Sequence, residues 1–402
     1  MAAQILEDLR KGTVPIEHVE MFSVGRCNEL REAASRLERV ARGQSQLSFI
    51  NGPYGSGKTH FLGMVRAEAL RRSFAVTHVV LSSQSCPLDR LDTVYGALMK
   101  GLSTPQCRDR PAFRAALDAW LSTMKRELID SGAGARLCRH YLSYYECGDG
   151  CFTKLLAERM PVLGGLHCDF ATVLTAYFNA NWSTDADIMQ LCERWLLGEP
   201  LPATARKRIG RAAHRAYPQN VDDTVALHAF GDAARIARSI GHSGLVIMLD
   251  EAETMPSVGR GGDFSAFTNL ALLMSASLRQ WEAVFCVYAT TPYFEQAFNR
   301  HLKDMRDAIH DEQAGDWIER EFHENRCNLA LPGREDLLKL AGKVHGLYQA
   351  AAGNGCPQAL PKPSWVKKKA ESIADSIGPS GGIRDFVTAL VREIDSFRST
   401  AA

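Results

Sequence analysis

The feature that most constrains this chain is a glycine-rich segment between two apolar stretches. Residues 52–59 read GPYGSGKT and satisfy the spacing G-x-x-x-x-G-K-T. Residues 47–50 before it predict a short buried strand, and residues 61–70 after it place apolar side chains at helical spacing. Because both flanks fit the motif, we favour a strand, a phosphate-binding loop and a helix over a chance glycine-rich turn.

The spacing explains how such a loop holds a charged triphosphate. Gly52, Gly55 and Gly57 let the backbone turn tightly and direct its N–H groups at phosphates, beside the N-terminus of the next helix. Lys58 is expected to reach the β- and γ-phosphates, and the Thr59 hydroxyl to bind Mg²⁺. The residues that we assign to nucleotide binding here are Gly52, Pro53, Tyr54, Gly55, Ser56, Gly57, Lys58, Thr59 and His60.

A second signal is an all-apolar run that ends in two carboxylates. Residues 245–249 read LVIML, which is typical of a parallel strand buried on both faces, and Asp250 and Glu251 follow. Ligands of α/β sheets bind at the carboxyl ends of the strands. We expect Asp250 to hold Mg²⁺ through water, and Glu251 to orient or deprotonate the attacking water.

Two other stretches are candidates for contact with the nucleotide. Residues 283–291 read as another buried strand, at whose end Thr290 or Thr291 either contacts the γ-phosphate or its water, or serves only as a turn. The segment before the loop either wraps an adenine or only covers the core with a helical arm. Its candidate adenine contacts are Val14, Pro15, Val24 and Gly25.

The order of the elements predicts an α/β fold with a parallel sheet. Residues 1–45 form an N-terminal helical arm, and residues 46–104 with 225–332 form the α/β core. Residues 105–224 break the alternation and predict a helical insertion, whose apolar stripes indicate core packing. Residues 333–402 are again helical and predict a C-terminal lid.

The insertion holds a weak metal signal and a basic run. Its clustered cysteines and histidines are Cys138, His140, Cys147, Cys151, His167 and Cys168. Cys147 and Cys151 have a ligand-like spacing, but no second tight pair accompanies them, so core or incidental thiols are favoured over zinc. Residues 206–215 carry several cations, for which a solvated helix face is favoured over a nucleic-acid contact.

Composition limits the function classes. The 402 residues are 46% hydrophobic and 23% charged with a net charge of +1, so no global basic field indicates nucleic acid. The 11 cysteines have no disulfide-rich pattern, and the chain shows neither an apolar signal segment nor a run long enough to span a membrane. We therefore expect a cytoplasmic protein with mostly free core thiols.

In the order of these motifs, the chain resembles AAA+ ATPases, in the branch of the origin-recognition and Cdc6-like initiators. The matching pieces are Val24-Gly25-Arg26 with Glu29-Leu30, GPYGSGKT, LVIMLDEAE, VYATT and Gly381-Gly-Ile-Arg384-Asp. Still closer, VGRCNEL, NGPYGSGKTHFL, FAVTHVVLS and LDEAETM look like the ATP-binding proteins of BREX and related bacterial phage-defence systems. The resemblance runs from about Gly12 to Asp395 and implies ATP, Mg²⁺, hydrolysis, self-assembly and a further candidate partner, DNA.

The resemblance also implies roles for single residues. Lys58 and Thr59 match the phosphate-loop pair, Asp250 and Glu251 match the acidic pair, and Arg384 matches a sensor arginine at the start of a lid helix. Thr290 or Thr291 stands where the family often has an asparagine sensor. An arginine finger for a neighbouring subunit would be Arg320 or Arg326, unless both form surface ion pairs.

These expectations leave three functions to weigh. The first is an ATPase of a phage-defence system that couples turnover to assembly or remodelling of a protein–DNA complex with other defence proteins. The second is a nucleotide-dependent switch or scaffold that binds ATP, turns it over little and recruits partners through the insertion. The third, a replication initiator or helicase loader, is disfavoured because we expect a DNA-binding domain after the lid, and the sequence ends at Ala402.

Overall fold

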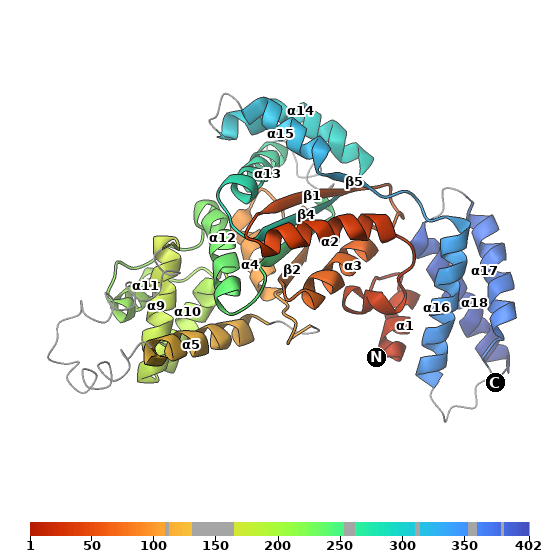
Figure 1. The fold of residues 1–402 in the computed structure, drawn as a ribbon, viewed down its shortest axis with the longest axis horizontal. Helices are drawn as coiled ribbons and strands as arrows, with labels where there is room; N and C mark the ends of the chain where they lie inside the picture. The colour runs from red at the N-terminus through yellow and green to blue at the C-terminus, as the bar shows by residue number, and fades with distance from the viewer. Residues whose placement is uncertain are drawn as a thin grey trace.

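The computed structural model describes residues 1–108, 112–130, 165–252, 262–309, 314–352, 360–378 and 382–401. At its centre lies a parallel sheet (Figure 1). Its five strands have the order β2-β3-β4-β1-β5, and each pair of neighbouring strands is parallel. The strands are β1 (Gln46–Asn51), β2 (Ala75–Val80), β3 (Leu245–Asp250), β4 (Val284–Thr290) and β5 (Arg326–Asn328). The predicted mixed α/β fold with a parallel sheet is confirmed.

The central strands are buried along their whole length, which accounts for their apolar sequences. Every residue of β3 and β4 is buried, because helices cover both faces of the sheet. One face packs against α2 (Cys27–Ala41) and α3 (Lys58–Arg71). The other face packs against α4 (Leu91–Lys100), α12 (Asp223–Ser239) and α13 (Gly262–Arg279), with α14 (Pro292–Ile309) and α15 (Ala314–Glu324) beyond them.

The helices of the insertion extend one side of this core. Within the described residues they are α5 (Phe113–Asp130), α9 (Cys168–Ser183), α10 (Ala186–Leu196) and α11 (Ala203–Ala213), and they lie at one end of the molecule (Figure 1). Trp120 and Trp195 are fully buried and belong to the same apolar cluster as the sheet residues Ile247 and Tyr288. The insertion therefore shares the hydrophobic core of the α/β unit, as its apolar stripes predicted.

The C-terminal helical region, which we predict to be a lid, lies at the opposite end of the molecule (Figure 1). It consists of α16 (Arg334–Ala352), α17 (Pro363–Ile377) and α18 (Ile383–Ala401), and α1 (Ala2–Arg10) packs on α16 and α18. Arg10 donates two hydrogen bonds to Asp395, of 2.8 and 3.1 Å, and the Tyr348 hydroxyl donates to the same carboxylate at 2.8 Å. The short helix η1 (Ile16–Met21) packs on α3 instead. The N-terminal arm thus divides between lid and core.

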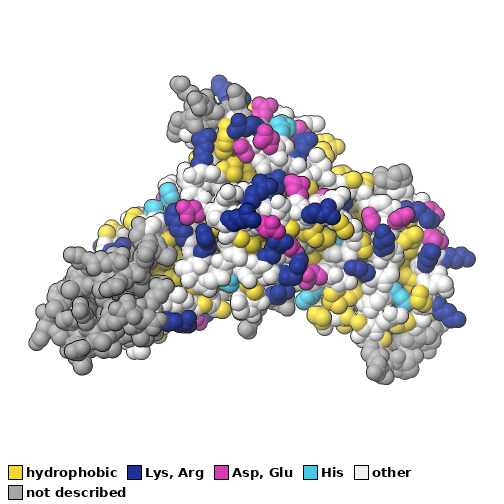
Figure 2. Space-filling model, in the orientation of Figure 1, with side chains coloured by type: hydrophobic (Ala, Val, Ile, Leu, Met, Phe, Trp, Pro, Cys, Tyr) yellow, Lys and Arg dark blue, Asp and Glu magenta, His cyan; other side chains and the backbone are white. Residues whose placement is uncertain are grey.

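The surface carries mixed charge on the side where α2 lies. Figure 2 shows basic and acidic side chains interspersed there. Glu38 on α2 pairs with Arg72 at 3.0 Å, and Arg36, whose side chain is buried, pairs with Glu32 at 2.9 Å. This face has no large field of one sign. Within the described ranges, no helix has the length and apolar character needed to cross a bilayer.

Candidate functional site

The glycine-rich loop joins β1 to α3 and has the backbone that its sequence predicted. Gly55 and Gly57 have φ angles of +83° and +87°, in the left-handed region that favours glycine. A Cβ on Gly55 would come within 2.6 Å of Gly382 Cα, and a Cβ on Gly57 within 2.7 Å of Ile383 Cδ1. These two glycines are therefore needed both for the turn and for the close approach of the lid.

A cavity of about 490 Å³ opens at the N-terminus of α3. The arm, the loop, the end of β3 and the first turn of α18 all contribute to its walls. Its lining residues are Leu9, Gly12, Thr13, Val14, Phe22, Tyr54, Gly55, Gly57, Lys58, Thr59, His60, Asp250, Glu251, Leu340, Gly382, Ile383, Arg384, Asp385, Val387 and Thr388. The structure thus brings the two sequence signals and Arg384 into one cavity.

Lys58 is the cation of the loop. Its side chain is buried, Nζ donates to the Gly52 carbonyl at 3.1 Å, and Nζ lies 5.2 Å from the centre of the Tyr54 ring. The Tyr54 side chain itself is 71% exposed. The ammonium group is therefore held at the loop, beside the N-terminus of α3, which is an end of a helix that favours anions.

Asp250 and Thr59 form the oxygen-rich part of the site. The Thr59 hydroxyl donates to Asp250 Oδ2 at 2.7 Å, and the Glu251 backbone N–H donates to Oδ1 at 2.9 Å. Burial alone would raise the pKa of Asp250, but these donors and the nearby His78 outweigh it and hold that pKa below its usual range. Because Thr59 gives its hydrogen to Asp250, its lone pairs remain available. An ionised carboxylate beside a hydroxyl oxygen fits the ligand preference of Mg²⁺.

Two hydroxyls, one in the loop and one at the end of β4, lack partners within the described ranges. Thr290 is 1% exposed and Ser56 is fully buried, and neither side-chain oxygen has a hydrogen-bond partner there. Neither residue lines the main cavity. The Thr290 carbonyl accepts the Gly52 N–H at 3.2 Å, so this strand end contacts the loop through its backbone.

The proposed adenine contacts divide between two cavities. Val14 lines the main cavity, whereas Val24 lines a neighbouring cavity of about 230 Å³, and Pro15 and Gly25 line neither. Other apolar residues that line the main cavity include Leu9, Phe22, Leu340 and Val387. Sequence reasoning missed these four as site residues, because they come from an arm and a lid that lie far apart in the chain.

His60 connects the loop helix to the arm. Its ring stacks on Phe22 with centroids 5.3 Å apart, and its Nε2 lies 3.0 Å from the Ser23 hydroxyl. Burial, then the charges of Arg26 and Lys343, lower the pKa of His60 to about 4. The ring is therefore neutral near pH 7. Its position after Thr59 was the only signal for it in the sequence.

The two candidate finger arginines lie outside the cavity wall. Arg320 is 57% exposed in its side chain, and its guanidinium lies 3.7 Å from the Glu321 carboxylate. Arg326 pairs with Glu295 at 2.5 Å. A role toward a neighbouring subunit remains a prediction for both.

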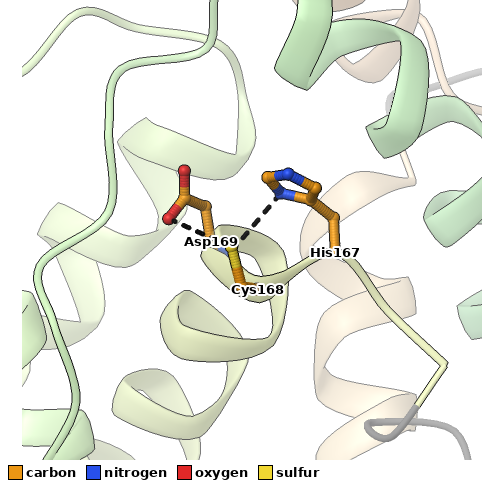
Figure 3. A group of neighbouring side chains, drawn as sticks. All are labelled: His167, Cys168 and Asp169. Carbon is orange, nitrogen blue, oxygen red and sulfur yellow. Dashed lines mark hydrogen bonds between the residues drawn. The ribbon is translucent and has the colours of Figure 1, made fainter.

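The metal signal of the insertion reduces to one local group in the described residues. Cys138, His140, Cys147 and Cys151 lie outside those residues. The ligand atoms of His167, Cys168 and Asp169 lie within 4.8 Å of one another at the start of α9 (Figure 3). The Asp169 N–H donates to His167 Nδ1 at 3.4 Å, so this imidazole nitrogen caps the helix. Helix capping explains why His167 and Asp169 lie close together.

The basic run at 206–215 lies on and after α11 and is largely engaged locally. Arg206 and Lys207 lie over the Tyr217 ring at 5.6 and 6.0 Å, and Arg208 lies 3.6 Å from Asp187. Arg206 also donates to the Pro218 carbonyl at 3.0 Å. These contacts are those of a partly paired surface helix. Of the described cysteines, those at 86, 107, 192, 286 and 327 are free and buried, as predicted.

The fold and the site together define a mixed α/β protein with a phosphate-loop motif at the carboxyl edge of a parallel sheet. The family model described as BREX system ATP-binding protein BrxC/D matches residues 1–400, and the chain belongs to this family. Membership implies ATP binding in a phage-defence system and confirms the resemblance seen in the sequence. A search of curated proteins and a search of solved structures found no match.

Proposed function

We propose that this protein is an AAA+-type ATPase that binds ATP with Mg²⁺ in the main cavity and hydrolyses it. The observation that carries the proposal is the convergence of Lys58, Thr59, Asp250, Glu251 and Arg384 on one cavity of about 490 Å³. These residues come from the loop, the sheet and the lid. Their types match what phosphoryl transfer needs, which is cations and oxygen ligands placed around a transferring phosphate.

Each residue has a distinct part in this proposal. Lys58 binds the β- and γ-phosphates, and Arg384 approaches them from α18. Thr59 and Asp250 hold Mg²⁺, which supplies charge neutralisation at the phosphate oxygens when it is bound. Glu251 lines the cavity with a carboxylate that orients or deprotonates the attacking water. The apolar side chains of Leu9 and its neighbours receive the adenine.

In this proposal, ATP binding is coupled to the rest of the molecule through the contact between the phosphate loop and the C-terminal helices. The C-terminal helices contact the loop where the Ile383 N–H donates to the Gly55 carbonyl at 3.0 Å, and α1 is hydrogen-bonded to α18 through Arg10 and Asp395. We propose that nucleotide turnover in the cytoplasm shifts the lid, and that this shift drives assembly with further copies or with other defence proteins, on DNA or apart from it.

The first test is the steady-state rate of ATP hydrolysis, with and without duplex DNA, against a Lys58→Ala control. Turnover that the control lacks supports the proposal, and stimulation by DNA supports a DNA-coupled role. Measuring particle size with and without ATP then tests self-assembly.

A second candidate function is a nucleotide-dependent switch. Lys58 and Arg384 are the only Lys or Arg residues among the described lining of the cavity, while Arg320 and Arg326 lie outside it. An arginine from a partner would then be needed for fast turnover. Tight ATP binding without turnover, by protein alone and with DNA, would favour this reading.

A further inference from the structure

His78 lies beside the acidic end of β3 and has no assigned role in the site. It belongs to the edge strand β2, which pairs with β3 so that Val80 lies opposite Asp250. The His78 Nε2 atom is 3.6 Å from Asp250 Oδ2, and His78 is 17% exposed in its side chain while Asp250 is 2% exposed. Within the described ranges, this buried nitrogen has no hydrogen-bond partner.

A buried imidazole N–H without an acceptor costs free energy, so its position needs a reason. Asp250 Oδ1 already accepts the Glu251 N–H, and Oδ2 accepts the Thr59 hydroxyl. A carboxylate oxygen has two lone pairs, so Oδ2 can accept a second hydrogen bond, and His78 Nε2 lies 3.6 Å from it. A small rotation of the ring, or one bridging water, completes this contact.

We propose that His78 is a positioning residue for Asp250. In its tautomer with hydrogen on Nε2, it donates to Asp250 directly or through one water and fixes the plane of the carboxylate toward Mg²⁺. The inference rests on the proposed function of the cavity and adds to it a residue that touches neither nucleotide nor metal. Asp250 then has three donors from three elements: Thr59 on α3, the Glu251 backbone after β3, and His78 on β2.

The consequence is specific to the metal. Partners that orient metal ligands typically account for about 10- to 100-fold in metal affinity. Without His78, Asp250 keeps two donors but loses the one that restrains it from the β2 side. Nucleotide affinity measured without Mg²⁺ does not involve Asp250 and stays unchanged.

The experiment compares two replacements of similar size and flexibility, His78→Met and His78→Gln. Only the glutamine has an amide that can donate to Asp250. The affinity of a fluorescent ADP analogue is measured with excess Mg²⁺ and with a chelator, and the ratio gives the gain due to Mg²⁺. We expect His78→Met to lower this gain about 10-fold or more, and His78→Gln to retain most of it.

The control is Thr77→Val, the next residue on the opposite face of β2. It removes the hydrogen bond from the Thr77 hydroxyl to the Leu98 carbonyl and so perturbs the strand without touching Asp250. If Mg²⁺ raises the nucleotide affinity of His78→Met as much as that of the wild type, the inference is wrong. It is also wrong if Thr77→Val loses as much of this effect as His78→Met. Neither result would contradict the proposed function. Absence of nucleotide binding by the wild-type protein would overturn the proposed function, and the inference with it.

Discussion

At the residue scale, contacts within the loop hold the Lys58 ammonium group in position. The ammonium is buried, yet it has a carbonyl acceptor in Gly52 and an aromatic face in Tyr54, so its charge is compensated in place. Both contacts belong to the loop itself. The cation is thereby held among backbone N–H groups that favour an anion.

Replacing Lys58 by Ala removes this cation and is expected to weaken ATP binding about 10- to 100-fold, the value of a hydrogen bond to a charged group. Equilibrium binding of a fluorescent ATP analogue measures the change. Lys339→Ala on the exposed side of α16 is the matched control and should leave affinity unchanged. Equal affinities in wild type and Lys58→Ala would contradict the assignment.

Glu251 has a backbone that a residue with a side chain seldom adopts. Its φ angle is +55°, in the left-handed region, at a cost of about 1 kcal/mol. In this conformation its N–H bonds Asp250, while its side chain is exposed at the cavity. The two adjacent carboxylates thereby have separate environments, one buried and one open.

Glu251→Gln keeps the size of the side chain and removes its ability to take a proton. We expect ATP affinity close to that of the wild type and a hydrolysis rate at least about 100-fold lower, the usual contribution of a general base. Rate and affinity are measured on the same preparation, with the exposed Glu282→Gln as control. Full turnover in Glu251→Gln would exclude Glu251 as the residue that activates water.

At the scale of elements, the decisive contact is between the phosphate loop and the first turn of α18. Gly55 and Gly382 approach so closely that a Cβ on Gly382 would lie 2.7 Å from Gly55 Cα. The hydrogen bond from Ile383 N–H to the Gly55 carbonyl lies beside this contact. Backbone meets backbone here, so neither side can yield as a flexible side chain would.

Gly382→Ala is therefore expected to push α18 away from the loop and to carry Arg384 with it. We predict about a 10-fold or greater loss of ATP affinity, because part of the binding free energy is then used to return the displaced helices to the closed position. Small-angle scattering should show a larger radius of gyration. Gly342→Ala on α16 is the control, because a Cβ there meets nothing within 4 Å. Wild-type affinity and size in Gly382→Ala would show that the lid does not depend on this contact.

At the scale of the whole molecule, Asp232 joins the insertion to the core. It lies on α12, is 2% exposed, and accepts the backbone N–H of His167 at the start of α9 at 2.9 Å. Burial raises the pKa of Asp232 to about 6, against the opposing effects of this hydrogen bond and Arg235. The join between the two units is therefore sensitive to pH.

The sign of this sensitivity follows from the raised pKa. Between pH 3.8 and about 6, Asp232 is protonated in the folded protein but ionised in the unfolded chain. The protonated carboxyl group therefore stabilises the folded state fully below pH 3.8, and this stabilisation is lost as the pH rises through about 6. Asp232→Asn cannot ionise. We expect the free energy of unfolding of the wild type, relative to this variant, to fall by about 2 to 3 kcal/mol over this range.

Denaturant unfolding of both proteins at a series of pH values measures the difference. Asp187→Asn is the control, because its carboxylate is 80% exposed and its loss should leave the pH profile that of the wild type. Parallel profiles for wild type and Asp232→Asn would contradict the prediction.

Much of the fold and the phosphate-loop part of the site could be predicted, because they depend on residues that are contiguous in the sequence. The glycines at 52–59 predict the backbone conformation of the loop, and the apolar run before Asp250 predicts a strand buried on both faces. The edge at which Lys58 and Asp250 meet follows from parallel strands alone. Membership in the BREX ATP-binding family agrees with this reading.

By itself, then, the sequence determined the loop, the buried strands, the acidic pair and the family, since backbone conformation and burial depend on nearby residues and their period. Only the tertiary structure decided that α1 packs on the lid, that Leu9 and Val387 share a wall, that Gly382 touches Gly55 and that His78 faces Asp250. These contacts join residues that are distant along the chain. No local periodicity encodes them, because they arise when separate elements pack against one another.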